Sequence, residues 1–276
     1  MAIKTYRPYT PSRRGTAVID YRKLLSGDKP EKSLLEVKQK RGGRNHQGRL
    51  TVRSRGGGSR QHYRLVDFGR KREGAAATVK SLQYDPNRSA FIALVQYPDG
   101  QLSYIIAPEG LKVGATVTSG AGVEIRLGNT LVLDRIPDGT LIHNIELLPG
   151  QKAKLVRAAG TAAQLMAKEG KDAIIRLPSG EMRRVPRMCR ATIGQVSNVD
   201  HDNVKLGKAG STRHIGRRSH TRGTVMNPVD HPHGGGEGKT NSGRPPTSAT
   251  GVKSKGFRTR PKSKSKKHLV KDRRVK

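Results

Sequence analysis

The sequence predicts a mainly β protein whose folded centre lies between two strongly basic extensions. Three observations support this fold class: short apolar or alternating runs separated by turn residues, a scarcity of helical segments, and an uneven distribution of charge. Many short strands at close, regular spacing are typical of small barrels or a sandwich rather than of alternating βαβ units.

The expected strands follow one another between residues 50 and 197. Turn sequences separate several of them, and Pro-Ser-Gly at residues 178–180 indicates a hairpin. In chain order the expected strands cover residues 50–53, 62–68, 77–82, 90–97, 102–107, 115–118, 123–127, 141–147, 153–156, 173–177, 181–185 and 191–197.

Residues 161–169 are the one segment with helical character. The segment is rich in alanine with leucine and methionine, which have good helix propensity, and Gly160 and Gly170 bracket it. Because so short a helix is marginal, we expect only a turn or two. A seam near Asn129–Ile136 would divide the strands into two units of about seventy residues, a common size for small barrels.

The positive charge is concentrated at the two ends of the chain. Residues 1–72 hold 20 Lys/Arg against 5 Asp/Glu, residues 73–204 hold 15 against 13, and residues 205–276 hold 20 against 3, which together give the net charge of +34. Such cationic extensions repel themselves unless a polyanion neutralises them. Nucleic acid is the obvious partner, because duplexes carry one phosphate charge per about 1.7 Å of axis.

The C-terminal extension has little material for a core. Between Asn227 and His268 the only apolar residues are Val229, Ala249, Val252 and Phe257. This stretch cannot bury enough apolar surface to offset its chain entropy, so we expect it to be disordered when alone.

The single cysteine, Cys189, excludes an intramolecular disulfide and fits a reducing compartment. We interpret it as a small packing residue. The chain shows no signal peptide, and no run approaches the roughly 18 apolar residues of a membrane span. The basic extensions also lack amphipathic helices with bulky apolar anchors. We therefore expect a cytoplasmic protein with no membrane partner.

Residues 39–60 interleave arginine with glycine. Glycine lets the backbone approach a phosphate closely, and exposed N–H groups can form an anion nest. Arginine adds a bidentate fork that also stacks on bases. A flexible, solvated linker is the alternative, but the equally basic C-terminal extension favours RNA binding.

Residues 226–239 have the most unusual composition, Met-Asn-Pro-Val-Asp-His-Pro-His-Gly-Gly-Gly-Glu-Gly-Lys. A phosphate-binding P-loop is excluded, because His233 stands where that motif requires glycine and no apolar strand precedes it. A metal site on Asp230, His231 and His233 would lack a fourth ligand. We favour an extended loop held by RNA.

No enzyme motif emerges from the sequence. His231 could in principle act as a general base, but nothing supplies an orienting partner or a substrate pocket. A nucleophile elbow and a dinucleotide-binding fingerprint are both missing. Aromatic residues make up only 4%, without tryptophan, so base stacking is not the main binding mode. We expect no catalytic residue, no metal and no cofactor.

Residues 227–238 closely resemble the signature segment of the family of the second protein of the bacterial large ribosomal subunit. Matching segments cover residues 9–14, 42–49, 55–58, 84–90, 104–108, 157–161, 177–181 and 206–210. The resemblance implies an OB-fold-like barrel followed by an SH3-like barrel, with long basic non-globular extensions. The implied domains are residues 1–40 (N-terminal extension), 41–128 (OB-fold-like), 129–203 (SH3-like) and 204–276 (C-terminal extension).

The resemblance also implies a function. It indicates a structural protein of the large subunit that binds 23S-type rRNA near the peptidyl-transferase centre. It would support assembly of that region, tRNA binding and subunit association. Expected partners are rRNA, neighbouring ribosomal proteins, and tRNA and the small subunit by proximity, with no homo-oligomer. Two departures stand out: Arg213-His214 replaces an Arg-Trp pair, and residues 249–251 replace Pro-Trp-Gly.

The residues expected to contact RNA lie in both extensions. Asn227, His231 and His233 should make the more specific contacts, with His231 as structural support. Contacts with phosphate are expected from Arg13, Arg14, Arg41, Arg44, Arg49, Arg53, Arg55, Arg60, Arg213, Arg217, Arg218, Arg222, Lys239, Arg244, Lys253 and Lys255.

Two functions of other classes compete with this hypothesis. A DNA-compacting chromosomal protein would share the charge, but it would have repetitive tails or a dimerising helical core. An RNA-modifying enzyme would need a cofactor pocket or a pair of carboxylates. The varied, singular motifs of this chain favour neither.

Overall fold

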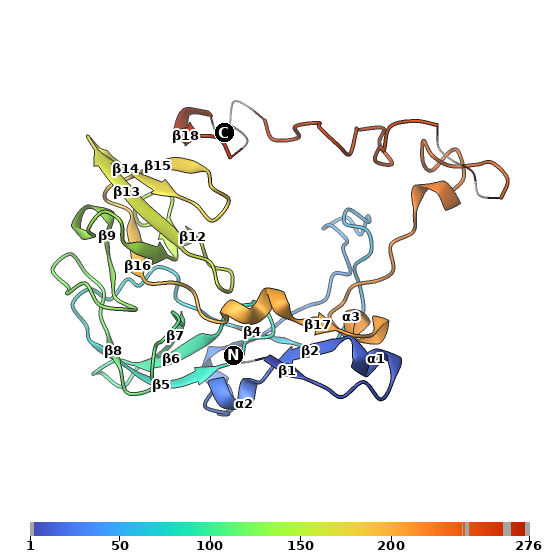
Figure 1. Ribbon diagram of the computed structural model, residues 1–276. Helices are drawn as coiled ribbons and strands as arrows, with labels where there is room; N and C mark the ends of the chain where they lie inside the picture. Colours follow the sequence, from blue (N-terminus) through green and yellow to red (C-terminus); the bar gives the residue numbers. More distant parts are fainter. Residues whose placement is uncertain (1–2, 239, 241–242, 262–265, 274–276) are drawn as a thin grey trace. The chain divides into compact units, whose positions relative to one another are not determined.

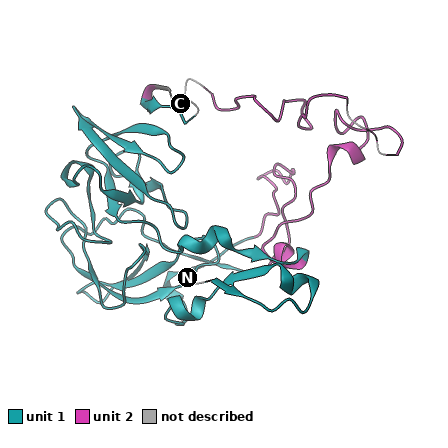
Figure 2. Cartoon of the chain, viewed as in Figure 1, with its two compact units in different colours: residues 1–39, 60–209, 268–276 teal, residues 40–59, 210–267 magenta. Residues whose placement is uncertain are grey.

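The computed structural model describes residues 3–238, 240, 243–261 and 266–273 (Figure 1). The chain forms two compact units (Figure 2). Unit 1 comprises residues 1–39, 60–209 and 268–276, and unit 2 comprises residues 40–59 and 210–267. Most of the Arg-Gly segment, which was expected to begin the domain 41–128, therefore clusters with unit 2. The bounds of the four domains themselves stay predictions.

A four-stranded antiparallel sheet in the order β7-β6-β5-β8 organises the first half of unit 1. In β5, buried and more exposed residues alternate, which is the pattern of a strand with one face on a core. Val79, Val95 and Ile105 from neighbouring strands meet in that core. The strands are β5 (Ala77–Gln83), β6 (Ile92–Gln96), β7 (Leu102–Ile106) and β8 (Thr116–Val117).

A seven-stranded sheet in the order β18-β15-β14-β13-β10-β16-β9 carries the second core. The hairpin expected around residues 178–180 is confirmed, because β14 pairs with β15 and places Ala173 opposite Val185. The strands are β9 (Thr130–Val132), β10 (Leu141–His143), β13 (Ala163–Glu169), β14 (Asp172–Arg176), β15 (Met182–Pro186), β16 (Arg190–Ile193) and β18 (Leu269–Lys271).

Beside this sheet, β11 (Ile145–Glu146) pairs with β12 (Ala153–Leu155). Two short 3-10 helices, η2 (Leu133–Arg135) and η3 (Val199–Asn203), complete this half of unit 1. The chain is thus mainly β, and its two groups of strands correspond to the expected OB-fold-like and SH3-like barrels.

The helix expected at residues 161–169 is wrong, because residues 163–169 form strand β13. This strand lies between β10 and β14, and it buries Ala163 and Leu165 completely. The alanine-rich sequence favours a helix only weakly, and ladder hydrogen bonds on both sides outweigh that preference.

Two expected strands are also wrong. Residues 123–127 connect the two sheets, because the carbonyl oxygen of Glu124 already accepts hydrogen bonds from the Arg126 backbone and the Asn129 side chain. Residues 50–53 form a turn, in which the backbone N–H groups of Thr51 and Val52 both donate to the carbonyl of Gly43. In each segment local hydrogen bonds replace a strand ladder.

Residues 1–39 are integrated into unit 1 more closely than a basic extension would be. Strands β1 (Ile3–Thr5) and β2 (Thr16–Ile19) form a three-stranded sheet with β17 (Lys205–Leu206), and Ile19 is buried in the first core. The remaining elements of this part are α1 (Pro11–Arg14), α2 (Tyr21–Leu24), η1 (Lys32–Leu34), β3 (Leu35–Val37) and its partner β4 (His62–Arg64).

Unit 2 has little regular structure. The helical elements at or within its bounds are α3 (Ala209–His214), η4 (Gly223–Val225) and η5 (Lys266–His268). Among the residues described in unit 2, only His231 is buried. None of the helices described for this chain has both the length and the apolar character that crossing a membrane requires.

Candidate nucleic-acid interface

The cations expected to contact RNA are concentrated in unit 2. This unit holds 20 Lys/Arg against 2 Asp/Glu, a formal net charge of +18. Within the described ranges, these side chains are exposed and form no ion pair: Arg41, Arg44, Arg49, Arg53, Arg55, Arg213, Arg217, Arg218, Arg222, Lys253 and Lys255. Exposed cations without carboxylate partners are available to phosphates.

The other expected cations lie in three different places. Arg244 is exposed in unit 2, and Arg13, Arg14 and Arg60 are exposed in unit 1. Lys239 lies outside the described residues. Unit 2 therefore gathers most, but not all, of the expected phosphate contacts.

Backbone turns shape the first part of the Arg-Gly segment. The Asn45 side chain accepts hydrogen bonds from the backbone N–H groups of Gln47 and Arg49, both at 3.0 Å. Gly43 has a φ of 79°, and a Cβ at this position would lie 2.2 Å from the carbonyl oxygen of Val52. Only glycine fits here, so this turn is built into the sequence.

The second part of the segment pairs with residues 214–218, which are far away in the sequence. The backbone N–H of Gly56 donates to the carbonyl of Gly216 at 3.0 Å. Likewise, Ser59 donates to His214 at 2.9 Å, and Arg218 donates to Ser54 at 3.0 Å. Both basic segments of the sequence thus contribute to one structure, which sequence reasoning did not predict.

Glycine makes this close pairing possible. Gly58 has a φ of 85°, and a Cβ on it would lie 2.9 Å from the backbone of Gly216. The signal that could have revealed the pairing is the presence of glycine beside arginine in both segments. Glycines allow two backbones to approach as closely as these do.

The pairing brings like charges together. Arg55 and Arg217 lie opposite each other in an isolated antiparallel bridge. Like charges directly opposite one another destabilise such a pair. An anionic partner would remove this repulsion and stabilise the arrangement.

Residues 226–235 form a compact loop closed by its own backbone. The carbonyl of Asn227 accepts the N–H groups of Asp230 and His231, and Gly235 donates to Met226 at 3.0 Å. A Cβ on Gly234 would lie 2.3 Å from the carbonyl oxygen of Asn227. The glycines that follow the histidines are therefore needed for the loop to close.

His231 lies inside this loop with only 9% of its surface exposed. Its Nδ1 accepts the backbone N–H of His233 at 3.0 Å, so a neutral ring carries its proton on Nε2. The ring also fills the space in front of Gly223, where a Cβ would lie 2.4 Å from ring atoms. A ring whose lone pair is engaged in this way supports the loop and is poorly placed to act as a general base.

His233 connects the loop to the following residues. Its Nε2 lies 3.1 Å from the hydroxyl oxygen of Thr247, and its ring centroid lies 5.0 Å from that of His231. Thr247 and Lys253 form a bridge that closes a small turn. The structure thus brings His231 and His233 together and leaves the Asn227 side chain exposed.

The zinc alternative gains no support from these contacts. The ring nitrogens Nδ1 of His231 and Nε2 of His233 already form hydrogen bonds. Across the part of the chain that the structure describes, no group of three or more His, Cys, Asp or Glu side chains is placed to hold a metal ion.

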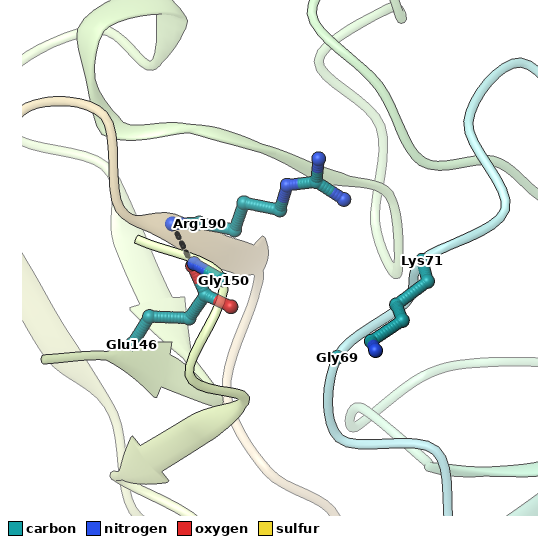
Figure 3. A pocket seen from close by; sticks show the side chains of 5 residues that line it. All are labelled: Gly69, Lys71, Glu146, Gly150 and Arg190. Atoms are coloured by element: carbon teal, nitrogen blue, oxygen red, sulfur yellow. Dashed lines mark hydrogen bonds between the residues drawn. The ribbon is translucent and has the colours of Figure 1, made fainter. Parts of the chain in front are cut away.

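A pocket of about 270 Å³ lies in unit 1 (Figure 3). Its lining includes Lys71, Glu146 and Arg190, together with Gly69 and Gly150. The Glu146 carboxylate accepts the backbone N–H groups of Arg190 at 3.1 Å and Gly150 at 3.4 Å. The acidic group of this pocket therefore holds the backbone in place, and no pair of carboxylates lines the described wall.

Other titratable groups in unit 1 are structural. Burial lowers the pKa of His143 to about 4, and Nδ1 of this ring hydrogen-bonds to the carbonyl of Gly194. Burial raises the pKa of Cys189 to about 12, and its side chain packs in the second core. Both groups are neutral at pH 7, which agrees with the interpretation of Cys189 as a packing residue.

Comparison with known protein families gives two matches. Residues 31–119 match the RNA-binding N-terminal domain of the ribosomal proteins L2, and residues 126–251 match the C-terminal domain of the same proteins. The two matches cover most residues of the two cores of unit 1 and most of unit 2, including the histidine loop.

Proposed function

Because this chain belongs to the ribosomal protein L2 family, we propose that it binds 23S-type rRNA near the peptidyl-transferase centre and supports the assembly of that region. Members of the family are RNA-binding structural proteins of the large ribosomal subunit, and they are not enzymes. We extend the proposal to tRNA binding and association with the small subunit, which would follow from that position.

The charge arrangement of unit 2 carries the proposal. Arginines from two distant segments lie side by side, and Arg55 stands opposite Arg217 with no ion pair to a carboxylate among the described residues. A protein that acted in isolation would gain nothing from such repulsion. Folded rRNA presents phosphates from several helices at once, and it can neutralise both segments together.

In this proposal the histidine loop recognises RNA through its shape. Burial and the hydrogen bond at Nδ1 fix the ring of His231, and the remaining Nε2–H is a donor for a phosphate, a ribose or a base. His231 thus supports a loop near the reaction centre and performs no chemistry. The expected partners are rRNA and neighbouring ribosomal proteins of a cytoplasmic large subunit.

A directed cleavage experiment tests the location. The only natural cysteine is buried, so a Val229→Cys variant offers one reactive thiol at a position that is 90% exposed and close to His231. Iron chelated at this thiol generates hydroxyl radicals that cut nearby RNA. In reconstituted large subunits we expect cuts in the peptidyl-transferase region. Cuts confined to other regions of the rRNA would contradict the proposed location.

A competition experiment tests the partner class. The wild-type chain is bound to labelled 23S-type rRNA and challenged with duplex DNA and with small-subunit rRNA at equal salt. We expect the unlabelled 23S-type rRNA to compete best. A preference for duplex DNA would favour the chromosomal alternative instead.

A further inference from the structure

We propose that the loop between β1 and β2 holds an unpaired RNA base on the ring of Tyr9, as a binding site separate from unit 2. The loop comprises residues 6–15 of unit 1. The inference rests on the proposed function, because the occupant is a base of the same rRNA. It assigns base stacking to a residue in a protein that otherwise binds mainly through cations.

Tyr9 is the observation that identifies the site. This side chain is 78% exposed, although the chain has few aromatic residues. Arg7 Nη1 donates to the hydroxyl of Tyr9 at 3.3 Å, and Tyr9 N–H donates to the carbonyl of Arg7 at 2.9 Å. Arg7 thus holds the polar end of the ring while most of its surface stays open to stacking.

The loop around Tyr9 is stiff. Pro8 and Pro11 flank the residue on both sides and restrict the backbone. The Thr10 side chain accepts the backbone N–H of Arg13 at 3.4 Å, which caps the short helix α1. A stiff loop loses little conformational entropy when it binds, so its contacts contribute more to affinity.

The base of the loop is fixed to β17. The Thr16 hydroxyl donates to the carbonyl of Ser12 at 2.6 Å. Gly207, which follows β17, packs so closely that a Cβ would lie 2.5 Å from that same carbonyl oxygen. The loop is therefore presented by the three-stranded sheet and does not depend on unit 2.

The surrounding charge selects nucleic acid as the occupant. Lys4, Arg7, Arg13 and Arg14 are the charged residues among positions 1–19, which contain no Asp or Glu. The guanidinium of Arg13 lies 4.2 Å from the centroid of the Tyr6 ring, which positions this cation. An exposed aromatic ring with several fixed cations and no acid matches a single-stranded segment, whose bases stack while its phosphates are neutralised.

The test measures the affinity of the full chain for a 23S-type rRNA transcript at several salt concentrations. We expect Tyr9→Ala to weaken binding by about five- to hundredfold, as the loss of one base–aromatic stack does. The dependence of log affinity on log salt concentration should keep its slope, because no phosphate contact is lost. By contrast, Arg14→Gln should reduce the steepness of that slope by about 0.7, as expected for one phosphate contact with a single strand.

Two controls make the test specific. Tyr9→Phe retains the ring, so we expect its affinity to stay within about twofold of the wild type. Leu148→Ala removes another exposed apolar side chain of unit 1 and should not change binding. Circular dichroism of each variant verifies the fold, which an exposed side chain should not alter.

The outcomes separate this inference from the proposed function. If Tyr9→Ala binds like the wild type while the wild type prefers 23S-type rRNA, the stacking site is refuted and the function stands. If Tyr9→Ala weakens binding and the whole loss comes with a less steep dependence of log affinity on log salt concentration, the substitution has removed a phosphate contact. The ring is then not a stacking platform. If the wild type shows no preference for this rRNA, the proposed function fails first.

Discussion

Units 1 and 2 are stabilised by different interactions. Unit 1 contains all four clusters of buried apolar residues that the described ranges form, whereas in unit 2 the one buried residue described is a histidine. Unit 2 is held instead by backbone hydrogen bonds and glycine turns. Such bonds compete with water and contribute little net stability without a core.

The arginines of the two units differ in the same way. In unit 1, Asp85 is fully buried and binds Arg88 at 2.5 Å and Arg64 at 3.8 Å. In unit 2, Arg55 and Arg217 face each other without a described carboxylate partner. The comparison indicates that unit 1 pairs its buried charges internally, whereas the paired basic segments of unit 2 depend on an external polyanion to neutralise them.

The two units should differ most in how much rRNA affinity is lost when positive charge is removed from each. We expect replacement of Arg53, Arg55, Arg217 and Arg218 by Gln to lower rRNA affinity by about 10²–10³-fold. The slope of log affinity against log salt concentration should become less steep by about 3 to 3.6. A filter-binding titration over several salt concentrations measures both quantities.

The matched control removes four exposed cations of the second barrel, Arg135, Lys154, Lys171 and Arg176, by the same change to Gln. We expect only a small loss of affinity in this variant. Equal losses in the two variants would show that net charge alone governs binding, and the contrast between the units would fail.

A second prediction concerns the buried ion pairs of unit 1. Asp85→Ala leaves Arg64 and Arg88 without their carboxylate, so we expect unit 1 to lose about 3–5 kcal/mol of stability. Thermal melting monitored by circular dichroism measures the loss. Asp99→Asn removes the exposed partner of Arg72 and should leave the melting temperature nearly unchanged. Equal effects of both substitutions would refute the role of the buried pair.

A third prediction uses pH. The pKa of His143 is about 4 in the folded state, against an ordinary value of 6.5 in the unfolded chain. Between these two pH values the ring is protonated in the unfolded chain and neutral in the folded chain. Unit 1 should therefore lose roughly 3 kcal/mol of stability from this group as pH falls from 6.5 to 4.

Urea denaturation across this pH range tests the role of His143. In His143→Asn this contribution is absent, so the stability gap between wild type and variant should shrink as the pH falls. A constant gap would show that the buried ring does not titrate as expected.

The smallest expected effect concerns the support of His231. Gly223→Ala places a methyl group against the ring, so we expect the loop to shift and rRNA affinity to fall by about tenfold. The melting temperature of unit 1 should not change. Gly210→Ala is the matched control, because beyond the chain neighbours and the backbone of its own helix no atom lies within 4 Å of the added Cβ. If both variants bind like the wild type, the fit between Gly223 and His231 has no role in recognition.

The sequence predicted the centre of the molecule better than its ends. Alternation of apolar residues located β5, because one face of this strand is buried and every second side chain points to it. The turn residues 178–180 located the hairpin of β14 and β15. Sequence reasoning did not identify β13 as a strand. Its alanines favour a helix, although their small side chains also fit a tightly packed sheet. The helix or strand propensity of a segment carries no information about the hydrogen bonds that it forms with neighbouring strands on both sides.

Part of the candidate interface was also predictable. Residue type alone indicated the exposed cations and the histidine loop. The pairing of residues 54–59 with residues 214–218 was not predictable, because backbone contacts between glycines leave no apolar pattern. The integration of residues 1–39 into unit 1 was missed because three short strands with one buried residue, Ile19, give a weak signal.

Hydrogen exchange of the full chain, free and bound to 23S-type rRNA, tests the central claim most directly. We predict that amides in the strands of unit 1 exchange slowly in both states. Amides in residues 40–59 and 210–238 should exchange rapidly in the free chain and become protected on the rRNA. Slow exchange of these residues in the free chain, equal to that of β5 and β14, would contradict the claim that unit 2 needs a polyanion to hold its structure.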